Sequence, residues 1–502
     1  MRNRGWLWSL VCVLTATVLA CSDAGTPDTE TVEQPAPQVS DQAQPEPAAA
    51  QSQMQQEEPA AVVEAGYGVD AGGPATAQAD PQAPPQQNAY GGPPPRVADP
   101  REALAAGVPL LPSAPAMGDE YGWSAAIDGD IIAVGAPYHD AVAENAGAVF
   151  VFERQDGEWV ETALLLPPYG EPLGWFGRWL ALDDGRLVIG APYEDVTLIN
   201  SDDLIIDAGS AYVYESIDGV WRRTATLVPE PLLPGASFGW SVAIDGDRLA
   251  VAAWGDTVDG ERVGAVYVYR ESKGLWRLEA RVVPPDPQPS HQFGRDIDLQ
   301  ENVLVVGAPG YDGEHSDIGA IYVYHQFGFA WNFAGKYIAP NGGAEDGLGT
   351  QVDLSLPRIA AGAHSHDQEG WNAGVLHLWR LYDTWEYDAR LVASDGAVND
   401  WFGYASAIDG NMMVVGSPGR ADPETGLYRT GAAYVFELID ETWVERGVLG
   451  PVDPATAGEQ AEFGWVIDLN AGEVVVGSWL ADAAVGEDAG AAAVYTIGSN
   501  EP

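Results

Sequence analysis

One unit of a repeating pattern runs from Phe238 to Val283 and reads FGWSVAIDGDRLAVAAWGDTVDGERVGAVYVYRESKGLWRLEARVV. Four of its segments, SVAI, RLAVAA, GAVYVYR and WRLEARVV, alternate apolar with polar residues or are rich in β-branched and aromatic ones, which is typical of strands. Asp245-Gly246 separates the first two segments, and this pair favours a tight hairpin turn because glycine accepts a positive φ without steric conflict. The unit therefore predicts four short antiparallel strands.

The same unit occurs seven times, starting near residues 121, 176, 238, 293, 348, 402 and 463. Its first mark is a glycine after an aromatic or, once, a leucine, and these glycines recur every 54 to 62 residues. A Gly-Ala-Pro-like end to the second segment and a Gly-Ala-x-Tyr-Val-Tyr-like third segment follow. A tryptophan opens the fourth segment in six units: Trp159, Trp221, Trp276, Trp331, Trp385 and Trp443. A period near 55 with four strands per unit indicates propeller blades.

The seventh unit ends near Ile497 without a tryptophan-led fourth segment. Counting back from the first unit places residues 104–111 in the position of that missing segment, and Leu110 then aligns with Leu165 and Leu227. Pairing the two ends of the domain would remove the open edge between the first and last blades. The sequence thus predicts an all-β fold, a seven-bladed β-propeller of four-stranded antiparallel blades, closed by an N-terminal strand near residues 104–111.

The Phe-Gly and Gly-Ala-Pro marks, seven times in phase, resemble the FG-GAP repeats of the integrin alpha-subunit propeller and of many bacterial surface proteins. A kelch or other propeller repeat is the first alternative, and an open β-sandwich array is the second. The resemblance implies a ligand-binding role and, in integrin-like members, calcium in an acidic loop between the first two strands. Here the corresponding segments, such as IDGDII and LQENVLV, leave no room for such a loop. We therefore interpret Asp128, Asp245 and Asp409 as turn-forming residues and expect no cofactor, with Ca²⁺ implied only by the resemblance.

The N-terminus has the pattern of a bacterial lipoprotein signal. Arg2 and Arg4 precede an apolar core that is too short for an ordinary membrane span. The following Val-Leu-Ala-Cys resembles a lipobox, which implies a signal peptide over residues 1–20 and lipidation of Cys21. Ser22 after the cysteine implies the outer membrane in a double-membrane bacterium. An ordinary signal peptide with an incidental cysteine is the alternative.

Residues 21–100 are rich in Pro, Ala, Gln and acidic residues, which predicts a disordered stalk, because such a segment buries too little apolar surface to fold. The propeller then occupies residues 101–498. With 74 acidic against 23 basic residues, the chain has a formal charge of −51, which disfavours nucleic acid as a partner. The two cysteines, Cys12 and Cys21, both precede the propeller, so its sequence offers no thiol for a disulfide or a nucleophile.

An aspartate recurs in the loop after the second strand of each unit, on the face that also carries the crossovers between blades. The seven are Asp140, Asp195, Asp256, Asp312, Asp367, Asp422 and Asp482. Two interpretations stay open: the carboxylates form a ring that attracts cations or a basic ligand, or each one accepts a hydrogen bond within its own loop. Loop lengths also vary most on this face, and variable loops on a rigid scaffold often carry recognition.

His364, His366 and Asp367 stand together where other units have a proline. Two imidazoles and a carboxylate are a ligand set for zinc or another transition metal, so the three residues are a candidate metal site. The recurring tryptophans, by contrast, are interpreted as packing between blades.

The chain contains no recognised catalytic motif, and we expect no enzyme activity. The favoured function is a monomeric cell-envelope lipoprotein whose propeller binds a protein or glycan ligand through its loop-rich face, with membrane contact through the lipid anchor alone. The alternatives are a polysaccharide-acting propeller enzyme and a purely structural envelope protein.

Overall fold

The computed structural model describes residues 104, 106–197, 203–328, 330–367, 370–423, 425–452, 458–482 and 486–498. The predicted signal peptide, Cys21 and the stalk lie outside these residues. All regular elements of the described part are strands. It contains no helix that is long and apolar enough to span a membrane.

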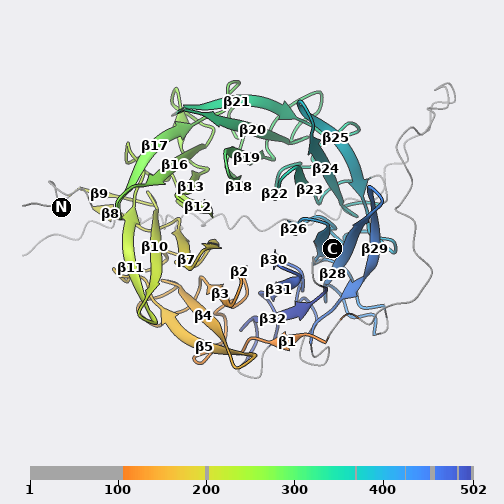
Figure 1. Cartoon of the computed structure of the whole chain (residues 1–502), viewed down its shortest axis with the longest axis horizontal. Coiled ribbons are helices and arrows are strands. Elements are labelled where there is room, and N and C mark those ends of the chain that lie inside the picture. Colours follow the sequence, from red (N-terminus) through yellow and green to blue (C-terminus); the bar gives the residue numbers. More distant parts are fainter. Residues whose placement is uncertain are drawn as a thin grey trace, which may run out of the picture. The chain divides into compact units, whose positions relative to one another are not determined.

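The strands form seven four-stranded antiparallel sheets arranged as blades around a central axis, which confirms the predicted fold (Figure 1). From the axis outward, blade one holds β2 (Ser124–Asp128), β3 (Ile131–Ala136), β4 (Ala148–Gln155) and β5 (Glu158–Leu165). Blade two holds β6 (Leu180–Asp183), β7 (Arg186–Ala191), β10 (Ser210–Ile217) and β11 (Val220–Leu227). Blade three holds β12 (Phe238–Asp245), β13 (Arg248–Ala253), β16 (Ala265–Glu271) and β17 (Trp276–Val282).

The other blades repeat this order. Blade four holds β18 (Ile297–Gln300), β19 (Val303–Ala308), β20 (Ala320–Phe327) and β21 (Ala330–Tyr337), and blade five holds β22 (Val352–Ser355), β23 (Arg358–Ala363), β24 (Val375–Leu381) and β25 (Trp385–Leu391). Blade six holds β26 (Ser406–Asp409), β27 (Met412–Ser417), β28 (Ala432–Ile439) and β29 (Thr442–Leu449). Two short hairpins, β8 (Val196–Thr197) with β9 (Leu204–Ile205) and β14 (Thr257–Val258) with β15 (Glu261–Arg262), extend the second-to-third loops of blades two and three.

Blade seven is built from both ends of the domain, as predicted. It holds β30 (Val466–Asn470), β31 (Glu473–Ser478) and β32 (Ala491–Thr496), and its outer strand is β1 (Val108–Pro109). Figure 1 shows β1 lying along β32. The pairing is antiparallel, with Val108 opposite Val494, and the Leu110 amide also donates to the Ala492 carbonyl at 2.9 Å. The observed strand is shorter than the predicted range of 104–111 but lies within it.

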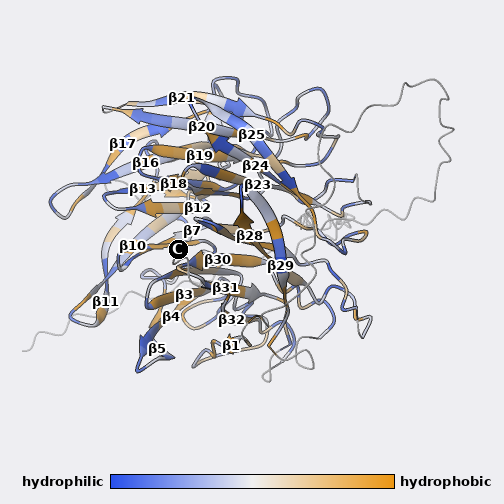
Figure 2. Cartoon of the chain, turned by 45° about the vertical axis from the view of Figure 1, so that its right-hand side comes forward, coloured by the Kyte–Doolittle hydropathy of each residue, from blue (hydrophilic) through white to orange (hydrophobic). Residues whose placement is uncertain are grey.

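The core lies between neighbouring blades, because each blade buries both of its faces. The third strands are apolar on both sides, and the first five residues of β16 are all buried. The outer strands face solvent on one side, so β5 alternates exposed and half-buried residues. Figure 2 shows the same gradient, with hydrophobic colour on inner strands such as β12 and β30 and hydrophilic colour on β5 and β21. The outer-strand tryptophans lie between blades: Trp221, for example, packs with residues of blades one and two.

The glycines of the repeat lie where the backbones of two blades meet. A Cβ atom on Gly307, at the end of β19, would lie 2.0 Å from the carbonyl oxygen of Gly349 in blade five. Gly319, which precedes β20, has φ +78°, and a Cβ there would lie 2.2 Å from the amide nitrogen of Leu348. Gly349 itself has φ +89° and lies against the Ala320 carbonyl. The Phe-Gly and Gly-Ala-Pro marks are therefore contact points between blades.

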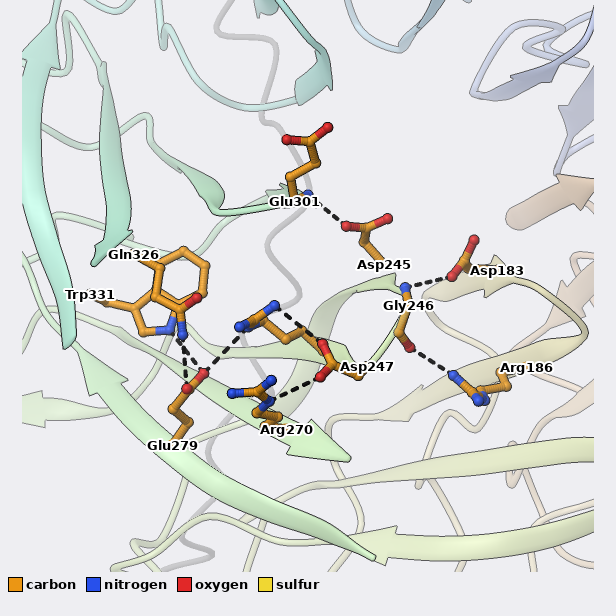
Figure 3. A network of polar contacts seen from close by, with 11 residues as sticks. Asp183, Arg186, Asp245, Gly246, Asp247, Arg270, Glu279, Glu301, Gln326 and Trp331 are labelled. Atoms are coloured by element: carbon orange, nitrogen blue, oxygen red, sulfur yellow. Dashed lines mark hydrogen bonds and ion pairs between the residues drawn. The ribbon is translucent and has the colours of Figure 1, made fainter. Parts of the chain in front are cut away.

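A ring of hydrogen bonds joins the turns between the first and second strands, each of which contains two residues. In each blade the last side chain of the inner strand accepts from a turn amide of the next blade. The pairs are Asp128 with Asp184, Asp183 with Gly246, Asp245 with Glu301, Gln300 with Leu356, Ser355 with Gly410, Asp409 with Ala471, and Asn470 with Gly129. Figure 3 shows two of these bonds, at Gly246 and Glu301. The Asp-Gly turns form as predicted, but the carboxylates also tie each blade to the next.

Candidate functional site

The seven aspartates after the second strands each accept a backbone amide of their own loop. Asp140, Asp312 and Asp367 accept from the residue five positions later, at 2.7, 2.9 and 2.8 Å. The same kind of bond is made by Asp195 to Asp207, Asp256 to Thr257, Asp422 to Thr425 and Asp482 to Asp488. This geometry is that of loop capping, one of the two open interpretations.

Asp256 is the only one of the seven with a completely buried side chain. It accepts from the Tyr267 hydroxyl at 2.7 Å and pairs with the Arg281 guanidinium at 3.1 Å. These bonds balance its buried charge, as a buried carboxylate requires. Asp256 therefore fixes the loop of blade three to the third and fourth strands of that blade.

The three residues of the candidate metal site take separate partners. His366 is buried, and its Nδ1 atom lies 2.7 Å from the Asp346 carboxylate. His364 packs edge-on against Tyr404, with 5.2 Å between the ring centroids, and burial followed by the charge of Arg295 lowers its pKa to about 4. Asp367 caps its own loop. Among the described residues no group of three or more His, Cys, Asp or Glu side chains gathers in the way that holds a metal ion.

The central cavity, of about 320 Å³, is lined by the inner strands of all seven blades. Its end on the loop-rich face is formed by the residues that directly follow the glycine of each Phe-Gly mark. We call this set the mouth ring: Trp123, Arg178, Trp240, Arg295, Thr350, Tyr404 and Trp465. All of them except Trp240 line the cavity.

Aromatic side chains form a continuous arc in and around the mouth ring. Trp465 lies 4.4 Å from Tyr404 and 5.3 Å from Trp123 between ring centroids. Trp479, at the end of β31, contacts both tryptophans at 4.8 and 4.9 Å. Further contacts extend the arc through Tyr138, Trp175, Tyr193 and Trp254 on one side and Trp401 on the other. Offset and edge-to-face packing of this kind holds each ring in place.

Polar side chains beneath the arc fix two of its rings. Glu462 has an almost fully buried side chain and accepts from the Trp479 Nε1 atom at 2.8 Å. It also pairs with Arg429, whose guanidinium lies 4.3 Å from the Trp401 ring centroid. The orientation of the arc is thus set by buried bonds and by packing.

Two arginines occupy the mouth ring beside these aromatics. The Arg178 guanidinium lies between the rings of Trp123 and Trp240, at 4.5 and 4.7 Å from their centroids, and its side chain is buried. The Arg295 guanidinium lies 5.0 Å from the same Trp240 ring. Burial and the neighbouring positive charge of Arg295 lower the pKa of Arg178 to about 10, so its guanidinium remains charged at neutral pH. Arginine is well suited to bind carboxylate, sulfate or phosphate groups in such a position.

Below the mouth ring, four carboxyl groups bridge the inner strands. Asp296, Asp298, Asp353 and Asp468 each accept an amide from the next blade, for example Val352 for Asp296 at 2.8 Å and Ile127 for Asp468 at 2.7 Å. Burial raises the pKa of Asp296 to about 7 and that of Asp468 to about 6. Burial and the adjacent Asp298, to which Asp353 is hydrogen-bonded, raise the pKa of Asp353 well above its usual value.

The mouth ring was not among the residues that the sequence singled out. The sequence does mark these positions, because the residue after each Phe-Gly mark varies among the blades while the residues around it repeat. Where packing between blades does not require one residue type, that position can serve a function. Seeing that six of the seven such positions line one cavity requires the ring geometry.

Comparison of the chain with protein-family models finds the FG-GAP repeat at residues 108–152, 159–214, 221–269, 276–324 and 385–436, which together cover half of the chain. Each match runs from an outer strand through the third strand of the following blade. Comparison with the curated proteins returns no match. The five in-phase matches, together with seven blades whose glycine marks all lie at blade junctions, establish that the chain belongs to the FG-GAP repeat family.

Proposed function

We propose that this propeller is a non-enzymatic binding module that takes a protein or glycan ligand on its loop-rich face, over the mouth ring. The observation that carries the proposal is the fixed arc of aromatic side chains around a cavity of about 320 Å³. Small-ligand sites are typically concave and lined by aromatic and apolar groups with a few placed polar ones, and this mouth has that chemistry. Repeat domains of this family are typically ligand-binding modules, which supports the same assignment.

The proposal includes display of the module as a monomer at the bacterial cell envelope, at the outer membrane or cell surface. It rests there on the sequence alone: a lipid on Cys21 would hold the chain, and residues 22–100 would separate the propeller from the membrane. A flexible segment of that length spans roughly 50 Å, enough to let the loop-rich face meet a ligand beyond the bilayer surface.

A binding experiment on the purified full chain tests this assignment. A glycan array and a pull-down from envelope extracts would identify a ligand, and the variants Tyr404→Ala and Trp465→Ala would then be compared with wild type. We expect each variant to weaken binding at least tenfold while its thermal midpoint confirms folding. Phe327→Ala is the matched control, because its ring is 70% exposed at the turn between β20 and β21, on the opposite face. If only Phe327→Ala lost binding, the ligand would bind on the opposite face and the assignment to the mouth ring would be wrong.

One observation favours the alternative of a polysaccharide-acting enzyme. Burial, followed by the charge of Asp488, raises the pKa of Glu120 to about 8, so this side chain is protonated at neutral pH, as a general acid must be. Sustained release of reducing ends from a polysaccharide, abolished by Glu120→Gln, would replace the binding assignment by a catalytic one. An absence of both turnover and ligand would favour a purely structural envelope protein.

A further inference from the structure

Many arginines in the described part of this acidic chain make ion pairs with carboxylates, but the two in the mouth ring do not. Ion pairs to Asp or Glu are made by Arg154, Arg248, Arg270, Arg281, Arg358, Arg380, Arg420, Arg429 and Arg446. Within the described part of the chain, neither Arg178 nor Arg295 makes such a pair, although the chain carries 74 acidic residues. Two arginines without an ion-pair partner therefore line one cavity.

Of the two arginines, Arg178 is the more deeply buried and has an unsatisfied hydrogen-bond donor. Its side chain is 6% exposed, and its Nε atom is buried without a hydrogen-bond partner among the described residues. A buried, unsatisfied donor of a charged group is unfavourable and calls for an explanation, of which a bound partner at the cavity is one. The guanidinium lies over the rings of both Trp123 and Trp240, and its N–H groups remain available to donate to a ligand.

Neighbouring carboxyl groups do not neutralise this pair. Glu120 lies near enough to Arg178 to feel its charge, yet burial keeps the pKa of Glu120 at about 8 and the group is largely neutral at pH 7. Asp296 follows Arg295 directly, but its two oxygens bond to Ser241, Ile297 and Val352 and to neither arginine, and burial raises its pKa to about 7. The mouth ring thus holds two arginines with no carboxylate partner.

The composition of the mouth ring distinguishes a sugar from a peptide. Its arginines come from blades two and four, whereas Tyr404, Trp465 and Trp123 come from blades six, seven and one. A uronic acid residue presents a flat C–H face and a carboxylate at its edge, so aromatic and guanidinium groups both find a partner. An acidic peptide side chain would use the arginines alone.

We propose that the ligand of the mouth ring is an anionic polysaccharide, bound through the carboxylates of its uronic acid units by Arg178 and Arg295. This inference rests on the proposed binding function and narrows it to one class of ligand. Aromatic rings of the arc then pack against the sugar faces, and the guanidinium groups select the charged polymer over a neutral one.

The test measures binding of three probes to the full chain by isothermal titration calorimetry: polygalacturonate, its fully methyl-esterified form, and polyglutamate. Esterification keeps the sugar and removes the charge, so we expect the ester to bind at least tenfold more weakly than polygalacturonate. Polyglutamate, which keeps the charge and lacks the sugar, should be weaker by a similar factor. Tighter binding of polyglutamate, or no binding of polygalacturonate, would overturn the proposal.

The variants Arg295→Gln and Arg178→Gln should each weaken polygalacturonate binding at least tenfold. Arg295 is the cleaner change because its side chain is only half-buried, and Arg446→Gln on the outer strand β29 removes the same charge far from the mouth and should bind as wild type does. If the ester binds as tightly as the acid, and Trp465→Ala abolishes both, the binding module stands and the anionic ligand class is wrong. If Arg446→Gln is as weak as Arg295→Gln, a general loss of charge explains the effect and the assigned site is wrong.

Discussion

Among single residues, the buried carboxyl groups around the axis join neighbouring blades, and their contribution to stability depends on pH. Asp298 and Asp353 lie side by side in blades four and five and are hydrogen-bonded to each other, which requires a proton between the two carboxyl groups. Each also accepts an amide from the next blade, so the pair contributes to the joints between three blades. A charged pair would repel in this buried position, and the structure therefore favours the protonated form.

This pair predicts a specific pH dependence of stability. Folded Asp353 keeps its proton to a higher pH than an unfolded aspartate, so above the usual pKa near 4 the folded state binds more protons and its stability falls as pH rises. Asp353→Asn removes this contribution and can keep both hydrogen bonds. Between pH 5 and 8 we expect the free energy of unfolding of wild type to fall relative to the variant, by at most about 4 kcal/mol.

Denaturant unfolding of both proteins across that range measures the difference. Comparing the two proteins is essential because burial lowers the pKa of His291 and of His364 to about 4, which destabilises both proteins equally as pH falls below 6.5. Asp367→Asn, at an exposed carboxylate that caps its own loop, is the control and should track wild type. Parallel curves for wild type and Asp353→Asn would contradict the shared proton.

At the scale of elements, the repeat marks describe how blades meet. At most junctions a glycine at the end of the second strand faces the carbonyl oxygen of the Phe-Gly glycine in the next blade, as Gly307 faces Gly349. Blade three has Ala252 instead, and its neighbour Gly294 is correspondingly less crowded: a Cβ there would lie 3.5 Å from the Ala265 oxygen, against 2.6 Å from the Ala320 oxygen at Gly349. The junction of blades three and four is therefore wider at this point.

This difference predicts that exchanging glycine and alanine at the end of the second strand destabilises blade four more than blade three. Gly307→Ala places a methyl group 2.0 Å from a backbone oxygen, which β19 can accommodate only by moving, and we expect a loss of about 1–3 kcal/mol. Ala252→Gly removes a methyl group and adds chain entropy to the unfolded state, for a loss of about 0.5–1 kcal/mol. Thermal unfolding of both variants checks the order, and an Ala252→Gly variant that is the less stable of the two would contradict it.

Strand positions, blade number and ring closure were predictable because they depend on local patterns that repeat in phase. The site was not, because its residues are the ones that break the pattern. Trp123, Arg178 and Tyr404 are unrelated in type, and only the rotation from blade to blade brings them to one cavity. The aspartates after the second strands do repeat in the sequence, and each accepts a hydrogen bond from an amide of its own loop.

At the scale of the whole molecule, the ring depends on one short joint. Blades one to six take all their strands from a continuous stretch of chain, whereas blade seven takes its outer strand from the start of the domain. Leu110 is 2% exposed, and its side chain packs with residues of blades one and seven. Its backbone carbonyl accepts a hydrogen bond from the Tyr121 hydroxyl at 3.1 Å. Residues 108–110 therefore join the first and last blades and so keep the mouth ring closed.

Opening this joint should both destabilise the ring and expose an edge. Leu110→Ala should lower the free energy of unfolding by about 2–5 kcal/mol, whereas Leu111→Ala, at a side chain that is 73% exposed, should change it by less than about 0.5 kcal/mol. Deletion of residues 102–111 leaves the amides and carbonyls of β32 unpaired, and unpaired edges recruit other chains. We expect this deletion to lower the thermal midpoint and to cause concentration-dependent association in analytical ultracentrifugation. A monomeric deletion variant with the wild-type midpoint would show that blade seven is stable with three strands and that β1 does not hold the ring closed.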